Sequence, residues 1–144
     1  MPSFTYYNSY KRDVQLGLID LDTDTIKGMV TSSSYTPNKD THAKRSDVTN
    51  EVTGTGYTAG GQTLQSVVVT LDPTNDRAIW DANDLLWDPV TVTGARRCVL
   101  YKSRGGAAED DELIGWVEFD EDKSPSNGPL RVQWDSVTGI AYMT

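Results

Sequence analysis

The residue types that support catalysis are sparse in this chain. His42 is its only histidine and Cys98 its only cysteine. Asp40 precedes His42 by two positions, which would suit an acid–base pair, but no nucleophile or second base stands beside them to complete a catalytic set. Cys98 lies in an apolar run typical of a strand and has no histidine partner nearby, so we expect a small buried thiol.

Three alternating aspartates, Asp20, Asp22 and Asp24, are the stretch that best suits a metal ion. Carboxylates at every second position open the calcium-binding loop of an EF-hand. That loop continues with a glycine and later a glutamate, and Thr25 and Thr31 stand in those places here. We therefore favour a turn in which the aspartates accept hydrogen bonds from backbone amides, with ion binding left open.

A glycine-rich stretch runs from Glu51 to Gly61 and suits a sharply folded loop. A phosphate-binding P-loop needs a lysine after its last glycine, and Gln62 follows Gly61. A dinucleotide-binding motif needs a helix next, whereas residues 62–71 have the pattern of a strand. We expect Tyr57 to fold back onto the sheet and to find a hydrogen-bond partner for its hydroxyl. The residues of this structural loop are Glu51, Gly54, Gly56, Tyr57, Gly60 and Gly61. With no complete catalytic, nucleotide or metal motif, the sequence predicts a non-enzymatic protein without a cofactor.

The charge of the chain argues against two classes of partner. Its formal net charge is −8 and its isoelectric point is near 4.5. Nucleic acids and anionic lipid surfaces are usually met by clustered Lys and Arg, so we expect neither as a partner. No apolar run approaches the roughly 18 residues of a membrane span, and no signal-peptide pattern is evident. We therefore expect synthesis in the cytoplasm.

Short apolar runs separated by turn residues predict an all-β fold. Residues 64–71 are apolar on both faces, as in a strand that is covered on both sides, and Asp72–Asp76 is a strong turn signal toward the next strand. Residues 95–102 read as a second central strand, and residues 130–134 alternate apolar and polar positions. The sequence predicts a single-domain antiparallel sandwich or barrel of about eight to ten strands with long polar loops, over residues 13–144.

Two features of the loops and core complete this prediction. The acidic run of residues 109–112 is expected to be a solvated loop tip. The four tryptophans lie within strand patterns and are expected in the core or at its rim: Trp80, Trp87, Trp116 and Trp134.

The aromatic side chains in the first twelve positions need other apolar groups to pack against. Such side chains serve cores and interfaces alike, so residues 1–12 either pack on their own domain or form an arm that docks on a neighbour. The polar loop at residues 32–48 is long enough to be a contact region as well. The residues expected at a partner contact are Phe4, Tyr6, Tyr7, Tyr10, Tyr35, Pro37 and His42.

A series of short motifs extends over most of the chain. The most specific is Asn-Glu-Val-Thr-Gly-Thr-Gly-Tyr-Thr-Ala-Gly-Gly at residues 50–61. Before it come Asp-Thr-Asp-Thr-Ile-Lys at 22–27, Ser-Tyr-Thr-Pro at 34–37 and Asp-Thr-His at 40–42. After it come Ala-Asn-Asp at 82–84, Trp87, Tyr-Lys at 101–102, Leu-Ile-Gly at 113–115 and Trp-Asp at 134–135. This series resembles a family of small virion structural proteins of tailed bacteriophages.

The resemblance implies a component of the virion and supplies no catalytic residues. An acidic protein would be repelled by packed DNA, so an outward-facing position suits this chain better. We therefore expect a capsid decoration (cement) protein that is made in the host cytoplasm and binds the outer surface of the phage head. Its expected partners are the major capsid protein and copies of itself, by analogy as a trimer. The alternatives are a neck or tail component, or a carbohydrate-binding module on the particle that uses Trp80 and Trp87.

Overall fold

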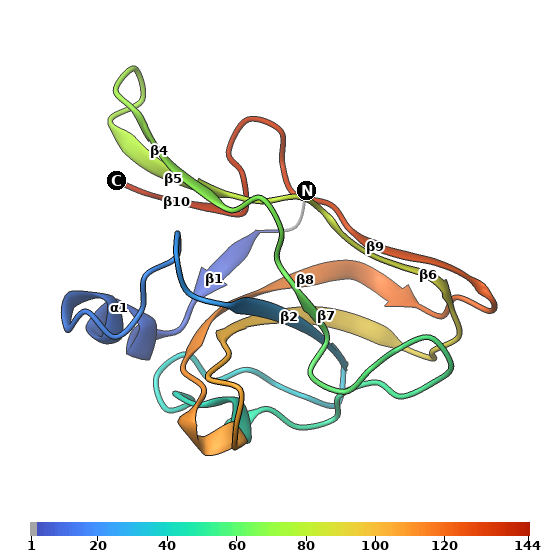
Figure 1. Ribbon diagram of the computed structural model, residues 1–144. Coiled ribbons are helices and arrows are strands. Elements are labelled where there is room, and N and C mark those ends of the chain that lie inside the picture. Colours follow the sequence, from blue (N-terminus) through green and yellow to red (C-terminus); the bar gives the residue numbers. More distant parts are fainter. Residues whose placement is uncertain (1–2) are drawn as a thin grey trace.

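The computed structural model describes residues 3–144, which form ten strands, one α-helix and two short 3-10 helices (Figure 1). The strands are β1 (Phe4–Tyr6), β2 (Ile26–Ser32), β3 (Gln62–Thr63), β4 (Val68–Asp72), β5 (Arg77–Asp81), β6 (Leu85–Val90), β7 (Ala95–Lys102), β8 (Leu113–Lys123), β9 (Gly128–Val132) and β10 (Ala141–Met143). The helices are α1 (Asn8–Gln15), η1 (Arg45–Asp47) and η2 (Ala108–Asp110).

The strands form three antiparallel sheets. Their orders are β1-β8-β7-β2-β3, β10-β5-β4 and β6-β9. This architecture confirms the predicted all-β class and the predicted number of strands. The sheets stay open, and within residues 3–144 none of them closes into a barrel.

β7 lies between β2 and β8 at the centre of the largest sheet, as its sequence predicts. Cys98 and Leu100 point to one face, where they join a buried cluster with Trp87 of β6 and Val132 of β9. Trp80, Trp87 and Trp134 are buried and Trp116 is half-buried, so the expectation for the tryptophans is confirmed.

The opposite face of the large sheet is covered by residues far away in the sequence. Val99 and Tyr101 of β7 pack there with Tyr7 and Tyr35. Tyr35 belongs to the long polar loop at residues 32–48, so this loop covers the second face of the sheet. The five-stranded sheet is therefore buried on both sides, which explains the continuous apolar run in β7.

The aromatic segment near the N-terminus packs on its own domain, which is one of the two alternatives that the sequence leaves open for residues 1–12. β1 pairs antiparallel with β8 through Phe4 and Val117. Tyr7 and Tyr10 are buried, and the rings of Tyr6 and Tyr10 stack with centroids 5.1 Å apart. Met1 and Pro2 lie outside the described residues. The segment includes α1, which the sequence did not predict because a helix of two turns carries little periodic signal.

The prediction that residues 64–71 form a strand covered on both faces is wrong. β4 begins at Val68, lies at the edge of the three-stranded sheet, and is exposed at its first four positions. The turn to β5 is confirmed, and Asp76 adopts the left-handed conformation there. Figure 1 shows the β4–β5 hairpin projecting from the body of the molecule.

The acidic run at residues 109–112 is only half solvated, which corrects the prediction of a loop tip. Asp111 and Glu112 are buried, whereas the two preceding residues are exposed. Arg45 donates to Asp111 at 2.7 Å, and Arg104 donates to both oxygens of Glu112 at 2.7 and 2.6 Å. Ion pairing and hydrogen bonding satisfy these carboxylates and make their burial possible.

Candidate functional site

The glycine-rich loop is closed by a single carboxylate. Oε2 of Glu51 accepts hydrogen bonds from the Tyr57 hydroxyl at 2.6 Å and from the Gly60 amide at 2.8 Å. The Tyr57 oxygen in turn accepts the amide of Val30 in β2 at 2.9 Å. Burial and the bond to Glu51 raise the pKa of Tyr57 well above its usual value. The predicted anchoring of this loop by Tyr57 is confirmed.

The glycines of this loop allow close backbone contacts. A Cβ atom on Gly54 would lie 1.8 Å from the carbonyl oxygen of Thr91, and one on Gly61 would lie 1.8 Å from that of Gly28. The carbonyl of Gly60 accepts the hydroxyl of Tyr101 at 2.6 Å. The carboxylate of Glu51, the hydroxyl of Tyr57 and these close backbone contacts hold the loop in its shape.

A chain of hydrogen bonds joins two buried tyrosines to the histidine. The hydroxyls of Tyr7 and Tyr35 lie 2.8 Å apart, and the Tyr35 hydroxyl lies 2.9 Å from Nδ1 of His42. The backbone amide of Asn38 also donates to this Nδ1 at 3.2 Å, so Nδ1 is an acceptor. These hydrogen bonds fasten the 32–48 loop to Tyr7, which directly follows β1.

The structure distributes the expected partner-contact residues between the core and the surface. Tyr7, Tyr10 and Tyr35 are buried, so their aromatic rings pack in the core of the free chain. The partly exposed ones are Phe4, Tyr6, Pro37 and His42. Asp40 accepts a hydrogen bond from Asn8 at 2.6 Å, and no hydrogen bond joins Asp40 to His42 within residues 3–144.

The aspartates at positions 20, 22 and 24 form the turn that was preferred over an ion site. Oδ1 of Asp20 accepts the amides of Asp22 and Thr23 at 3.0 and 3.2 Å, and hydrogen bonds from Thr23 and Asp22 lower the pKa of Asp20. Asp24 accepts the amide of Asp20 and forms an ion pair with Lys102 at 2.9 Å. In the described part of the chain, no group of three or more His, Cys, Asp or Glu residues is placed to hold a metal ion.

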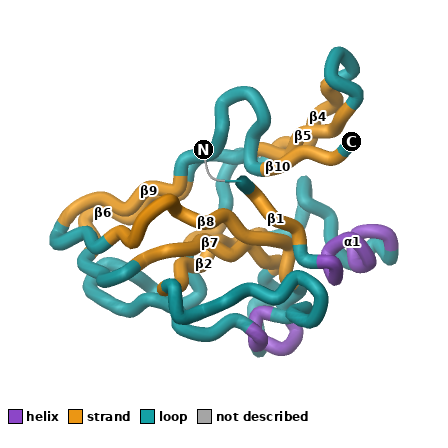
Figure 2. Tube along the Cα trace, turned by 180° about the vertical axis from the view of Figure 1, so that it is seen from behind, coloured by secondary structure: helices purple, strands orange, loops and turns teal. Residues whose placement is uncertain are grey.

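An apolar groove of about 570 Å³ lies between α1, the loop that follows it and the β10-β5-β4 sheet. These elements gather on one side of the molecule in both views (Figures 1 and 2). Trp80 and Ile19 form buried parts of its wall, while Val69 and Met143 are 47% and 41% exposed. The lining residues are Tyr6, Tyr10, Val14, Gly17, Ile19, Asp20, Leu21, Asp22, Val69, Ala78, Ile79, Trp80, Ala141 and Met143.

Three further apolar side chains near this groove are exposed. Leu16 and Leu18 follow α1 and are 65% and 40% exposed, and Leu71 of β4 is 84% exposed. The ionisable groups that line the groove are tyrosines and the carboxylates of Asp20 and Asp22. The sequence analysis did not identify this surface, because its apolar residues come from three separate segments. The sequence feature that points to this surface is the short apolar run at residues 16–21.

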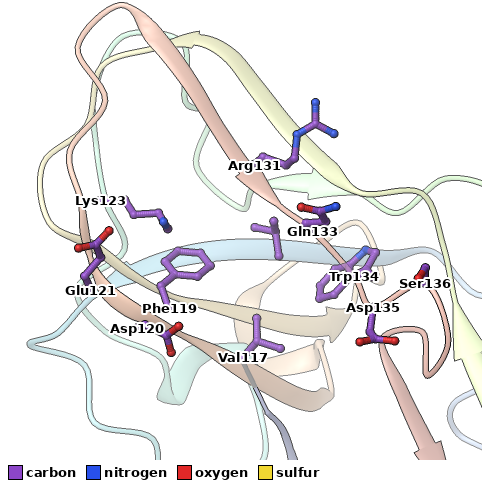
Figure 3. Close-up of a pocket in the computed structure, with 11 residues that line it drawn as sticks. Val117, Phe119, Asp120, Glu121, Lys123, Arg131, Gln133, Trp134, Asp135 and Ser136 are labelled. Carbon is purple, nitrogen blue, oxygen red and sulfur yellow. The ribbon is translucent and has the colours of Figure 1, made fainter. Parts of the chain in front are cut away.

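A polar pocket of about 520 Å³ lies between β8 and the end of β9 (Figure 3). Val117 and Phe119 form its apolar base with Trp134, whose indole N–H donates to the carbonyl of Asn83 at 3.1 Å. Around the base lie side chains of both charges and two neutral polar ones: Asp120, Glu121, Lys123, Arg131, Gln133, Asp135 and Ser136. The pocket therefore offers hydrogen-bond donors and acceptors above an apolar floor.

None of the residues 3–144 belongs to a helix long and apolar enough to cross a membrane. Comparison of the chain with models of protein families, with curated proteins and with solved structures gave no match.

Proposed function

We propose that this protein is a non-enzymatic structural component of a bacteriophage virion that decorates the outer surface of the head. The observation that carries the proposal is the apolar groove with its exposed apolar neighbours on an otherwise acidic protein. Contiguous exposed apolar surface of this kind marks interaction sites in soluble proteins. The motif series at residues 50–61 and around it supports the assignment to a virion, through resemblance.

The groove also indicates the chemistry of its partner. Val69 and Met143 are half exposed in the free protein, and burying apolar surface contributes roughly 25 cal/mol per Å². The carboxylates of Asp20 and Asp22 line the groove, so they favour an apolar segment flanked by Lys or Arg. The net charge of −8 opposes contact with packed DNA and favours the outer face of the head. The proposed partner is the major capsid protein.

The first test is the copy number of the protein in purified virions, measured by quantitative mass spectrometry against the major capsid protein. A ratio near one, or a simple fraction of it, supports head decoration. A few copies per particle would place the protein in the neck or tail instead. Absence from the particle would overturn the proposal.

The second test addresses the groove itself. Met143→Asp puts a charge into the groove, and Val137→Asp puts the same charge on a side chain that is 69% exposed and does not line the groove. Each variant is added to heads assembled without the protein. Met143→Asp should lose binding and Val137→Asp should keep it. Equal binding by both variants would exclude the groove as the docking surface.

A second candidate function is glycan binding on the virion surface, and the polar pocket favours it. Trp80 and Trp87 are 2% and 3% exposed, so neither ring offers an open face to a sugar. Gln133 and Arg131 line the pocket and offer amide and guanidinium groups to sugar hydroxyls. Calorimetry with host cell-surface glycans should then show binding that Gln133→Ala abolishes. Absence of binding by the unchanged protein would remove this candidate.

A further inference from the structure

The outer edge of β4 has no strand partner among the described residues. β4 pairs with β5 from Val68 to Asp72, and it ends the order β10-β5-β4. Its backbone N–H and C=O groups on the other side therefore form an open edge. Val68, Val69 and Leu71 on this strand are 48%, 47% and 84% exposed. The strand is thus open at its edge, and its face with Val69 and Leu71 is apolar.

This edge lacks the features that normally keep sheet edges from pairing. Natural edge strands are blunted by lysines, prolines, bulges or inward-pointing charges. From Gln62 to Leu71 the chain has no charged residue and no proline, and β4 pairs with β5 in unbroken register. The one charge in the strand, Asp72, forms an ion pair with Arg77 at 2.9 Å. The edge is therefore suited to pairing with another strand.

We infer that β4 pairs antiparallel with β4 of a second copy of this chain, around a two-fold axis that continues the three-stranded sheet from one copy into the other. A two-fold contact uses the same surface twice, and it is the commonest symmetry of soluble oligomers. Pairing of the whole strand places Thr70 opposite Thr70 of the other copy. Val69 of each copy then lies opposite Leu71 of the other, so exposed apolar side chains cover one another.

Self-complementarity selects a second copy as the occupant, because Val69 and Leu71 of one copy cover Leu71 and Val69 of the other. Two molecules that each carry −8 repel one another over most of their surfaces. The uncharged stretch from Gln62 to Leu71 is where two copies can approach without bringing carboxylates together. The inference concerns the free protein and shares Val69 with the proposed docking groove, and its test uses no phage heads. The expected trimer refers to the protein on the phage head, whereas the inferred dimer refers to the free protein.

The test is sedimentation equilibrium of the full chain over a range of concentrations. The unchanged protein should show the mass of two 15.9-kDa chains. Thr70→Lys places two like charges opposite each other and should raise the dimer dissociation constant about tenfold or more. Val137→Lys adds the same charge to an exposed side chain outside β4 and should leave the constant unchanged.

A disulfide trap tests the register. Antiparallel partners lie roughly 4.5–5.5 Å apart between Cα atoms, which a disulfide can span. Thr70→Cys should therefore give a covalent dimer on mild oxidation, and buried Cys98 does not compete. A protein that remains monomeric up to about 1 mM, where binding energy is only about 4 kcal/mol, overturns the inference. So does a trimer, or a dimer that tolerates Thr70→Lys and forms no disulfide through Thr70→Cys.

Discussion

The hydroxyl of Tyr57 and the carboxylate of Glu51 lie 2.6 Å apart, and the same hydroxyl oxygen accepts the amide of Val30. Tyr57 thus connects Glu51, at the start of the glycine-rich loop, with β2, an interior strand of the large sheet. Tyr57 also packs on Trp87, with ring centroids 5.6 Å apart. The ring and the hydroxyl therefore make separate contributions, which can be measured separately.

Tyr57→Phe should lower the free energy of unfolding by about 1–3 kcal/mol, since it keeps the ring and leaves the Val30 amide without its acceptor. Urea unfolding followed by tryptophan fluorescence measures the change. Tyr142→Phe is the matched control, because Tyr142 is 45% exposed and its hydroxyl has no hydrogen-bond partner within residues 3–144. Equal stability of the two variants would show that the hydroxyl network contributes nothing.

Two glycines with the same backbone angle separate conformational strain from crowding. Gly61 and Gly105 both have φ of +80°, but a Cβ on Gly61 would meet the Gly28 carbonyl oxygen at 1.8 Å, whereas Gly105 has open space around it. Gly105→Ala should cost roughly 1–2 kcal/mol, the penalty of a left-handed L-residue. Gly61→Ala should cost several kcal/mol more, because backbone must move to admit the methyl group.

Thermal unfolding by circular dichroism compares the two glycine variants directly. Gly61→Ala is expected to lose its cooperative transition at temperatures where Gly105→Ala is still folded. If both variants unfold at the same temperature, the close approach of Gly61 to β2 has no energetic importance.

The sequence predicted the Glu51–Gly61 loop because its determinants are local: glycines, one tyrosine and one glutamate within a few positions. It did not predict which apolar strands would be covered. β7 and β4 have similar apolar runs, yet one lies at the centre of the large sheet and the other at an edge. Strand order depends on pairings between distant segments, which periodicity does not encode.

The same limit applies to the acidic run and to the candidate docking surface. Asp111 is buried because Arg45, distant in the sequence, reaches it across the surface. The apolar groove combines α1 with β5 and β10, which lie far from one another in the sequence. Composition alone cannot place such groups together.

The free energy of unfolding should decrease at acidic pH, in part because Glu112 becomes protonated. The hydrogen bond and charge of Arg104 hold the pKa of this buried carboxyl below its ordinary value of 4.5. A carboxyl with a lowered folded-state pKa stabilises the fold above its unfolded-state pKa, and this contribution is lost as the pH falls through the folded-state value. Urea unfolding of the native protein should therefore show a decline in stability below about pH 4.5, and the loss of the Glu112 contribution is part of this decline.

Arg104→Gln should weaken that decline and lower stability at pH 7. It leaves Glu112 buried without its cation, and we expect a smaller loss of stability than for a fully buried pair because Arg104 is 41% exposed. The difference between native protein and variant should shrink as the pH is lowered toward 3. A difference that stays constant with pH would mean that Arg104 acts through packing and not through the charge of Glu112.

Cys98 should be inert toward thiol reagents in the folded protein. It is fully buried in β7, and burial raises the pKa of its thiol to about 12, so the reactive thiolate is scarce at pH 8. Val137→Cys adds an exposed thiol as an internal reference. In a reaction with a chromogenic disulfide reagent, the folded Val137→Cys variant should then release one equivalent of the reagent's coloured thiolate, from the added thiol. The same variant unfolded in guanidinium should release two equivalents. If Cys98 reacted as fast as the added thiol, β7 would be open to solvent, and the central position that the large sheet depends on would be wrong.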